Sequence, residues 1–271
     1  MKTVAAMLIA VTLAAAVASA QRRGGRFGYQ RIPENPAYDG AFQFCRIAFR
    51  NAPNGDGGGW FVDWPRADEN LTFRLSELTT TTVSLGSGGP RAYNHSVLNL
   101  TDVLTLSKCP FTMLTEPGGA YFDQAEAQGL REYLQRGGFL WADDFWGEYA
   151  WEHWVGELRK ALPPGEFTIA DVPLDHPIFH MLYDVHELPQ IPSIGFWVGT
   201  GGATSERGRD SAVPHARAAF DANGHMLVFM THNTDFGDAF EREGDMREYF
   251  NVFASRGYAV GINVILYAMT H

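Results

Sequence analysis

The 271-residue sequence lacks the motifs that mark several enzyme classes. It has no Gly-x-Ser-x-Gly elbow, and no set of Ser, His and Asp residues stands out, so serine hydrolase chemistry is not indicated. The glycine-rich stretch NGDGGGW at residues 54–60 lacks the spaced fingerprint of dinucleotide-binding turns and does not open directly into a helix. It therefore gives little support for nucleotide binding.

Cysteine is scarce, and Cys45 and Cys109 are the two examples. In an oxidising compartment they could form a single disulfide, and two buried free thiols beside apolar strand-like runs are the alternative. Neither lies in the small-residue turn expected around a catalytic thiol, and Cys109 begins its predicted strand rather than following it. A cysteine nucleophile is therefore not expected.

Positive charge is also limited, since 21 Lys and Arg against 31 Asp and Glu give a formal net charge of −10. Such an acidic chain is a poor candidate for binding nucleic acid or anionic membranes, because both would repel it. The early part of residues 21–40 contains four arginines, at positions 22, 23, 26 and 31, together with three glycines. We interpret that segment as a flexible leader.

The longest apolar run lies at the beginning of the chain. Residues 1–20 combine Lys2, an apolar stretch at 4–17 and the small residues Ala18-Ser19-Ala20, as in a cleaved signal peptide. No later stretch has the length and apolarity expected of a bilayer span, so no integral membrane span is expected after cleavage. The pattern predicts a periplasmic or secreted protein whose residues 41–271 form a single domain.

Strand and helix patterns alternate from residue 41 onward. Strands are predicted within residues 41–50, 110–115, 139–143 and 225–235, and helices within 69–82, 122–138, 146–162 and 255–271. Asp123 is expected to begin its helix, Gly137 to end it, and Ser255 to cap a buried final helix. Such alternation predicts a three-layer α/β fold with a mostly parallel sheet. Residues 165–217 are irregular and suggest a functional cover.

Acidic and polar residues follow two of the predicted strands. Because ligands bind outside the carboxyl ends of parallel strands, we expect both sets at one ligand-binding edge. The candidates are Asp143, Asp144 and Trp146 after the strand at 139–143, and His232, Asn233, Asp235 and Asp238 after the strand at 225–235.

Other interpretations of these residues remain open. The aspartates at 143 and 144 could cap the following helix, or serve as a general acid and base in catalysis. Asp235, Asp238 and Glu241 recur every three residues and could line one solvated helix face. His232 with nearby aspartates would make a mixed metal-ligand set, but neither a protein-bound metal nor another cofactor is expected. Trp151 and Trp154 are expected to pack in the core.

Several motifs, in order, resemble a bacterial family known as domain of unknown function 4159. They are DWPRADENLTFRLSELT, GGFLWADD, DHPIFH, THNTDFGDAFE and GINVILYAMTH, and the resemblance covers about residues 41–271. The family is similar to the class I glutamine amidotransferase superfamily and to trehalose-utilisation proteins, which implies a flavodoxin-like arrangement. Amidotransferases carry their catalytic cysteine on a strand-to-helix turn, where this chain has Asp143 and Asp144. The resemblance therefore implies the scaffold without glutaminase chemistry.

Three functional hypotheses follow from these residues. The first is an exported module that binds a small polar, carbohydrate-like ligand, or an envelope protein, at the acidic edge. The second is a hydrolase that uses Asp143 or Asp144 as general acid or base. The third is a structural envelope component in which every acid caps a helix.

Overall fold

The computed structural model describes residues 31–89 and 92–271. The predicted signal peptide and residues 21–30 of the predicted leader lie outside the described residues. Within the rest of the leader, Asn35 exchanges two hydrogen bonds of 2.8 Å with the backbone of Val97, one as donor and one as acceptor. This part of the leader therefore contacts the edge of the central sheet.

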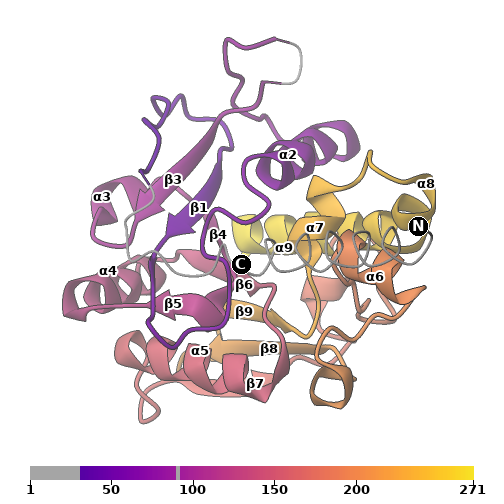
Figure 1. Cartoon of the computed structure of the whole chain (residues 1–271). Helices are drawn as coiled ribbons and strands as arrows, with labels where there is room; N and C mark the ends of the chain where they lie inside the picture. The colour runs from indigo at the N-terminus through magenta and orange to yellow at the C-terminus, as the bar shows by residue number, and fades with distance from the viewer. Residues whose placement is uncertain (1–30, 90–91) are drawn as a thin grey trace, which may run out of the picture.

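The centre of the fold is a seven-stranded sheet in the order β3-β1-β4-β6-β9-β8-β7 (Figure 1). Its strands are β1 Phe44–Ala48, β3 His95–Asn99, β4 Phe111–Thr115, β6 Phe139–Asp143, β7 Thr168–Asp171, β8 His215–Phe220 and β9 Met226–His232. The first five in the order are parallel, whereas β8 runs antiparallel to both β9 and β7. A separate two-stranded sheet pairs β2 Arg50–Asn51 with β5 Ala120–Tyr121.

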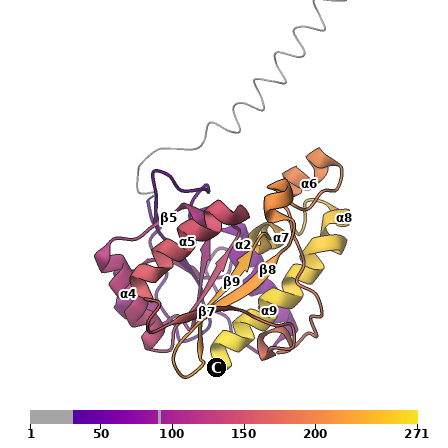
Figure 2. The ribbon, with the colours of Figure 1, turned by 90° about the horizontal axis from the view of Figure 1, so that it is seen from below.

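Helices cover both faces of the sheet, which makes a three-layer α/β fold. Figure 2 shows α4 and α5 on one face and α2, α7 and α9 on the other. The helices are α2 Arg66–Leu78, α3 Val103–Leu106, α4 Gln124–Gln135, α5 Gly147–Ala161, α6 Ile194–Thr200, α7 Phe236–Glu241, α8 Arg247–Tyr249 and α9 Ser255–Thr270. Short helical turns are η2 Pro117–Gly119, η3 Pro177–Phe179, η4 Gly208–Ser211 and the π-helical η5 Phe250–Ala254. The predicted fold class is confirmed.

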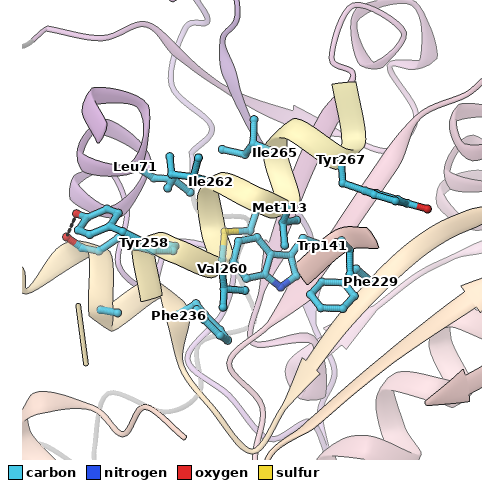
Figure 3. Close-up of a cluster of buried hydrophobic side chains, with 14 of the residues drawn as sticks. Leu71, Met113, Trp141, Phe229, Phe236, Tyr258, Val260, Ile262, Ile265 and Tyr267 are labelled. Carbon is cyan, nitrogen blue, oxygen red and sulfur yellow. Dashed lines mark hydrogen bonds between the residues drawn. The ribbon is translucent and has the colours of Figure 1, made fainter. Parts of the chain in front are cut away.

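Each face of the sheet has its own apolar core. Trp141 of β6 is fully buried and packs against Phe229, Phe236 and Phe240 on the α9 side (Figure 3). Its indole nitrogen donates a 2.8 Å hydrogen bond to the hydroxyl of Thr231. On the opposite face, Trp154 is fully buried against Phe122, as core packing predicted. Trp141 and Trp154 therefore belong to two different cores, one on each face of the sheet.

The final helix begins earlier than the sequence predicted. Ser255 does not cap α9, because α8, η5 and α9 continue as one helical stretch and Ser255 has helical backbone angles. By length and composition alone, the stretch Arg247–Thr270 is long and apolar enough to cross a membrane. The sequence-based expectation that no stretch after residue 20 has this length and apolarity is therefore wrong. Within the fold 61% of the apolar window of Arg247–Thr270 is buried, and core helices share this composition.

The predicted strands and the α4 boundaries are confirmed, but several elements were missed. Asp123 caps α4 through a capping box with Glu126, and Gly137 has the left-handed φ of 91°. The missed strands β3, β7 and β8 are short or poor in alternation, and β7 and α6 lie inside the segment predicted to be irregular. Cys45 and Cys109 form a disulfide that joins β1 to the residues before β4.

Candidate functional site

The two acid-bearing strands are neighbours in the sheet and end at the same edge. β6 and β9 pair in parallel, with Asp143 opposite Thr231. Because both strands leave the sheet there, the residues that follow them are brought together. We call the carboxyl ends of β6 and β9, together with the residues that directly follow them, the carboxyl edge.

Asp143 has a positioning role at this edge. Its side chain is fully buried and accepts hydrogen bonds from the hydroxyl of Thr231 and from the backbone N–H groups of Phe236 and Gly237, at 2.8 and 3.1 Å. Burial raises the pKa of Asp143 to about 7, although these hydrogen bonds favour the ionised form. The carboxylate therefore holds the first turn of α7, with neither oxygen free of protein donors.

Asp144 has different surroundings from its neighbour. It lies in the left-handed region with φ 62° and its carboxylate accepts a 3.0 Å hydrogen bond from the indole nitrogen of Trp146. Burial, followed by the charges of Glu116 and Asp63, raises its pKa well above the usual range. Neither aspartate caps α5, whose N-cap residue is Trp146 without a side-chain bond. The alternative interpretation, in which these aspartates cap the following helix, is therefore wrong.

Asp235 and Asp238 lie at the start of α7 and are both buried. Asp235 caps this helix by accepting a 2.7 Å hydrogen bond from the backbone N–H of Asp238. Asp238 accepts a 2.6 Å bond from the backbone N–H of Ile194. The exposed fractions of Asp235 and Asp238 are 4% and 5%, so the solvated-stripe interpretation is wrong for both. Burial raises both pKa values, with further raising by neighbouring aspartates at Asp235 and by Glu241 at Asp238.

A further aspartate, Asp63, reaches the edge from the loop between β2 and α2. It has a left-handed φ of 62°, is 8% exposed, and its Oδ2 is buried without a hydrogen-bond partner. Its carboxylate approaches the first turn of α7 so closely that a Cβ built on Gly237 would lie 2.2 Å from Oδ2. The sequence prediction missed Asp63, because in DWPRADEN it resembles an ordinary residue before a helix.

These side chains form a compact acidic group. One carboxylate oxygen from each of Asp63, Asp144 and Asp235 lies within 4.8 Å of the other two. We call these residues the acidic trio. A second group joins Asp63 to Asp238 and Glu241, but Arg242 lies 3.4 Å from Asp238 and 2.8 Å from Glu241. No member of the trio forms an ion pair with a cation among the described residues, and the charge of Arg46 acts on Asp63 only at longer range.

A fourth acid, Glu116, lies under the glycine-rich loop at the same edge. It accepts a 2.6 Å hydrogen bond from the backbone N–H of Gly59, and burial raises its pKa to about 7. The loop thus binds a carboxylate of its own chain. In the described part of the chain, non-glycine residues with left-handed φ are Asp63, Glu116, Asp144 and Asn233. All four lie at this edge, where such backbone strain often accompanies a functional site.

The segment between α6 and β8 covers the carboxyl edge. Arg207 forms an ion pair of 2.8 Å with Asp56 of the glycine-rich loop. Asp210 accepts a 3.2 Å hydrogen bond from the backbone N–H of Glu148 at the start of α5. Glu206 accepts a 2.7 Å bond from the backbone N–H of Ser193. These contacts tie the segment to the glycine-rich loop, to the start of α5 and to the residue before α6.

His232 and Asn233 are at the edge but serve its framework. The ring of His232 is 2% exposed, packs on Phe145 and lies 3.0 Å from the carbonyl oxygen of Gly147. Burial lowers its pKa to about 4. Asn233 accepts from the backbone N–H of Gly147 and donates to the carbonyl of Val213, both at 2.8 Å. His232 belongs to neither metal-competent group of the described residues, so the mixed histidine–aspartate set is not assembled.

Two shallow surface hollows lie away from the acids. Both are lined in part by residues 33–38, together with residues near β3 or α3, and neither includes a residue of the acidic trio. They bring together no group of titratable side chains comparable with the trio. The carboxyl edge is therefore the better candidate site.

The described geometry defines a class: a three-layer α/β protein whose carboxyl edge carries buried acids and whose turn after β6 holds an aspartate. The family model described as "Domain of unknown function (DUF4159)" matches residues 44–269, and the chain belongs to this family. No curated protein sequence matches the chain.

Proposed function

We propose that this protein is exported and binds a polar, carbohydrate-like ligand at its carboxyl edge. The observation that carries the proposal is the acidic trio. Three carboxylates from separate segments converge within 4.8 Å, and Oδ2 of Asp63 has no protein donor. Buried polar groups in native proteins almost always have hydrogen-bond partners, so an oxygen without a protein donor indicates a water, ion or ligand as its partner.

A hydroxyl group of a sugar would supply the donor that Oδ2 of Asp63 lacks, because carboxylate oxygens accept hydrogen bonds. Trp146, which donates to Asp144, adds an aromatic side chain at the same edge. The edge has no cysteine: both cysteines of the chain are in the Cys45–Cys109 disulfide. Glutamine hydrolysis through a cysteine nucleophile is therefore not part of the proposal.

Two observations support export. Residues 1–20 have the composition of a signal peptide. The chain also contains a disulfide, which persists mainly in oxidising compartments such as the periplasm or the extracellular space. Fractionation of cells that produce the full chain, followed by amino-terminal sequencing, would test this: cleavage after Ala20 supports export, and an intact cytosolic chain contradicts it.

The ligand proposal is tested by calorimetry with the purified mature chain and a panel of neutral mono- and oligosaccharides. Wild-type protein is expected to bind at least one of them, and Asp144→Asn and Asp235→Asn are expected to weaken that binding at least tenfold. Asp184→Asn is the matched control, since the Asp184 side chain is 78% exposed and pairs with His180 away from the edge. If no sugar binds, or if the control weakens binding equally, the proposal is wrong and the structural-envelope hypothesis gains support.

A second candidate is a glycoside hydrolase in which Asp144 is the general acid. The favouring observation is the raised pKa of Asp144, since a general acid must keep its proton near neutral pH. Asp143 is a poorer candidate because both its oxygens are engaged in holding α7. Release of reducing sugar by the wild type, abolished in Asp144→Asn while sugar binding persists, would favour hydrolysis over binding alone.

A further inference from the structure

We propose that the acidic trio binds one Ca²⁺ ion, with Asp63, Asp144 and Asp235 as its protein carboxylate ligands. The inference deepens the proposed function, because the ion would occupy the same carboxyl edge, and it rests on that edge being the site. It can nevertheless be tested with the metal alone. Four features of the described residues support it: spacing, charge, an unpartnered oxygen and donor chemistry.

The spacing of the oxygens fits a calcium coordination sphere. Ca²⁺ takes oxygens at about 2.3–2.6 Å, so two ligands on opposite sides lie roughly 5 Å apart. The trio offers three oxygens that are all within 4.8 Å of one another. Mg²⁺, with oxygens at about 2.0–2.1 Å in a strict octahedron, would draw the same carboxylates closer together or bind through water. Ca²⁺ therefore needs the least rearrangement.

Charge separates the trio from the other buried acids of the edge. Asp238 and Glu241 have Arg242 within 3.4 Å. In contrast, no Lys, Arg or His side chain of the described residues forms an ion pair with Asp63, Asp144 or Asp235. Buried charges in folded proteins are paired or coordinate metals, because an isolated one is costly to desolvate. A divalent cation would supply the short-range compensation that no ion pair of the described residues provides, since Arg46 acts on Asp63 only at longer range.

The unpartnered oxygen of Asp63 is an observation that does not depend on the spacing or the charge of the trio. Asp63 is 8% exposed and its buried Oδ2 has no hydrogen-bond partner. This oxygen points toward the first turn of α7, where Asp235 begins the helix and Gly237 has no side chain. A Cβ on Gly237 would come within 2.2 Å of Asp63 Oδ2 and 3.4 Å of Asp235 Oδ1. Because Gly237 has no side chain, the carboxylates of Asp63 and Asp235 can both lie beside the first turn of α7.

The donor set favours a hard cation. All three ligands are carboxylates, and neither cysteine nor histidine contributes, since His232 is held between Phe145 and the carbonyl of Gly147. Carboxylate oxygens suit Mg²⁺, Ca²⁺ and Mn²⁺ rather than the softer transition metals. Ca²⁺ accepts six to eight oxygens, so three carboxylates leave positions for water or for adjacent hydroxyls of a sugar. The ion would thus link the acidic trio to the proposed ligand.

The test uses the mature chain, treated with EDTA and then dialysed, and calorimetric titration with CaCl₂. One Ca²⁺ per chain is expected, with a Kd at or below about 1 mM, the range of extracellular calcium modules. Asp63→Asn, Asp144→Asn and Asp235→Asn should each weaken binding at least about tenfold, and Asp184→Asn should not change it. Titration with MgCl₂ should give weaker binding than CaCl₂.

Folding of the variants is checked by circular dichroism and thermal unfolding in EDTA, where Asn keeps the shape of Asp and removes a like charge. If a single variant fails to fold, the other two still test the proposal. The proposal is overturned if the wild type binds no Ca²⁺ at 10 mM, or if all folded trio variants bind like the wild type.

Failure of this inference and failure of the proposed function can be told apart. Sugar binding by a wild-type protein that binds no Ca²⁺ would keep the proposed function and overturn the calcium site. Calcium binding without any sugar binding would do the reverse. Sugar binding that requires Ca²⁺, and is lost in the trio variants, would support both.

Discussion

Two buried charged groups lie close together in this protein and differ in how their charge is compensated. Arg46 of β1 and Asp68 of α2 are both fully buried and form an ion pair, and Arg46 also donates to the carbonyls of Trp60 and Val62, each at 3.2 Å. The acidic trio is nearly as buried, but has no cationic partner among the described residues. The charge of Arg46 acts on Asp63 at longer range and is matched at short range by Asp68.

The contrast indicates different roles for the two groups. A buried pair with its hydrogen bonds satisfied needs nothing from outside the chain, although replacing it with apolar residues can be neutral or even stabilising. Three carboxylates that repel one another are unfavourable without a proton or a cation. We therefore interpret Arg46 and Asp68 as structural and the trio as a site. The following predictions test that division, from the largest expected effect to the smallest.

Removing one member of the compensated pair should have the largest effect. Arg46→Met leaves Asp68 buried without a partner, and we expect a loss of about 3–5 kcal/mol in the free energy of unfolding. Urea denaturation followed by circular dichroism measures it. The double variant Arg46→Met, Asp68→Leu should recover most of the loss. A single variant as stable as the wild type would show that the pair is not structural.

His232 is buried and belongs neither to the Arg46–Asp68 pair nor to the acidic trio. It should contribute to the pH dependence of the free energy of unfolding. Its folded-state pKa is lowered to about 4, so folding favours the neutral ring. Its contribution is fully present above the unfolded pKa of about 6.5 and is lost as the pH falls from there through about 4. The loss amounts to about 3 kcal/mol, at 1.36 kcal/mol per pKa unit.

Urea denaturation between pH 7 and pH 4 measures this contribution. His232→Phe should flatten the acid side of the stability curve, whereas His225→Asn, at a side chain that is 68% exposed, should leave it unchanged. If His232→Phe loses as much stability between pH 7 and pH 4 as the wild type does, other groups are responsible for the pH dependence.

Crowding the trio should have an intermediate effect. Gly237→Ala places a methyl group 2.2 Å from Asp63 Oδ2, and we expect a loss of about 1–3 kcal/mol, as for other overpacked sites. Gly156→Ala in α5 is the control, because nothing lies within 4 Å of its added Cβ and alanine favours a helix. Thermal unfolding compares the two. Equal stability of both variants would mean that Asp63 does not approach α7 in the way described.

Removing one charge of the trio should have the smallest effect, and with the opposite sign. In EDTA, Asp144→Asn is expected to raise the free energy of unfolding by about 1 kcal/mol, the usual size of a point-mutant effect, because it relieves repulsion. Asparagine can still accept the bond from Trp146. Urea denaturation in EDTA measures the change. A clear loss of stability would make Asp144 a structural residue like Asp68.

Local patterns in the sequence predict much of the fold and part of the candidate site. Strand 139–143 follows from a short apolar run, and the start of α4 follows from the preference of aspartate for the N-cap, and the structure has both. Asp144 and Asp235 were predicted to share an edge because parallel strands end together, and the structure places their carboxylates in one group.

Other features depend on contacts between distant segments, which local patterns do not specify. Asp63 reaches the site through a loop that follows β2, so its place depends on tertiary packing against α7. The positioning role of Asp143 was not predicted, because the amides that it binds belong to α7, which is distant in sequence. The choice between a disulfide and free thiols likewise depended on the distance between β1 and the start of β4.

Terbium luminescence tests the central claim most directly. Tb³⁺ replaces Ca²⁺ in oxygen sites and emits when a nearby tryptophan is excited, and the indole nitrogen of Trp146 lies 3.0 Å from an oxygen of Asp144. The account predicts sensitised emission from the wild type that CaCl₂ displaces, weaker emission from Trp146→Phe, and none from Asp235→Asn. Absence of emission from the wild type, or emission that persists in folded Asp235→Asn, would contradict a cation site at the acidic trio.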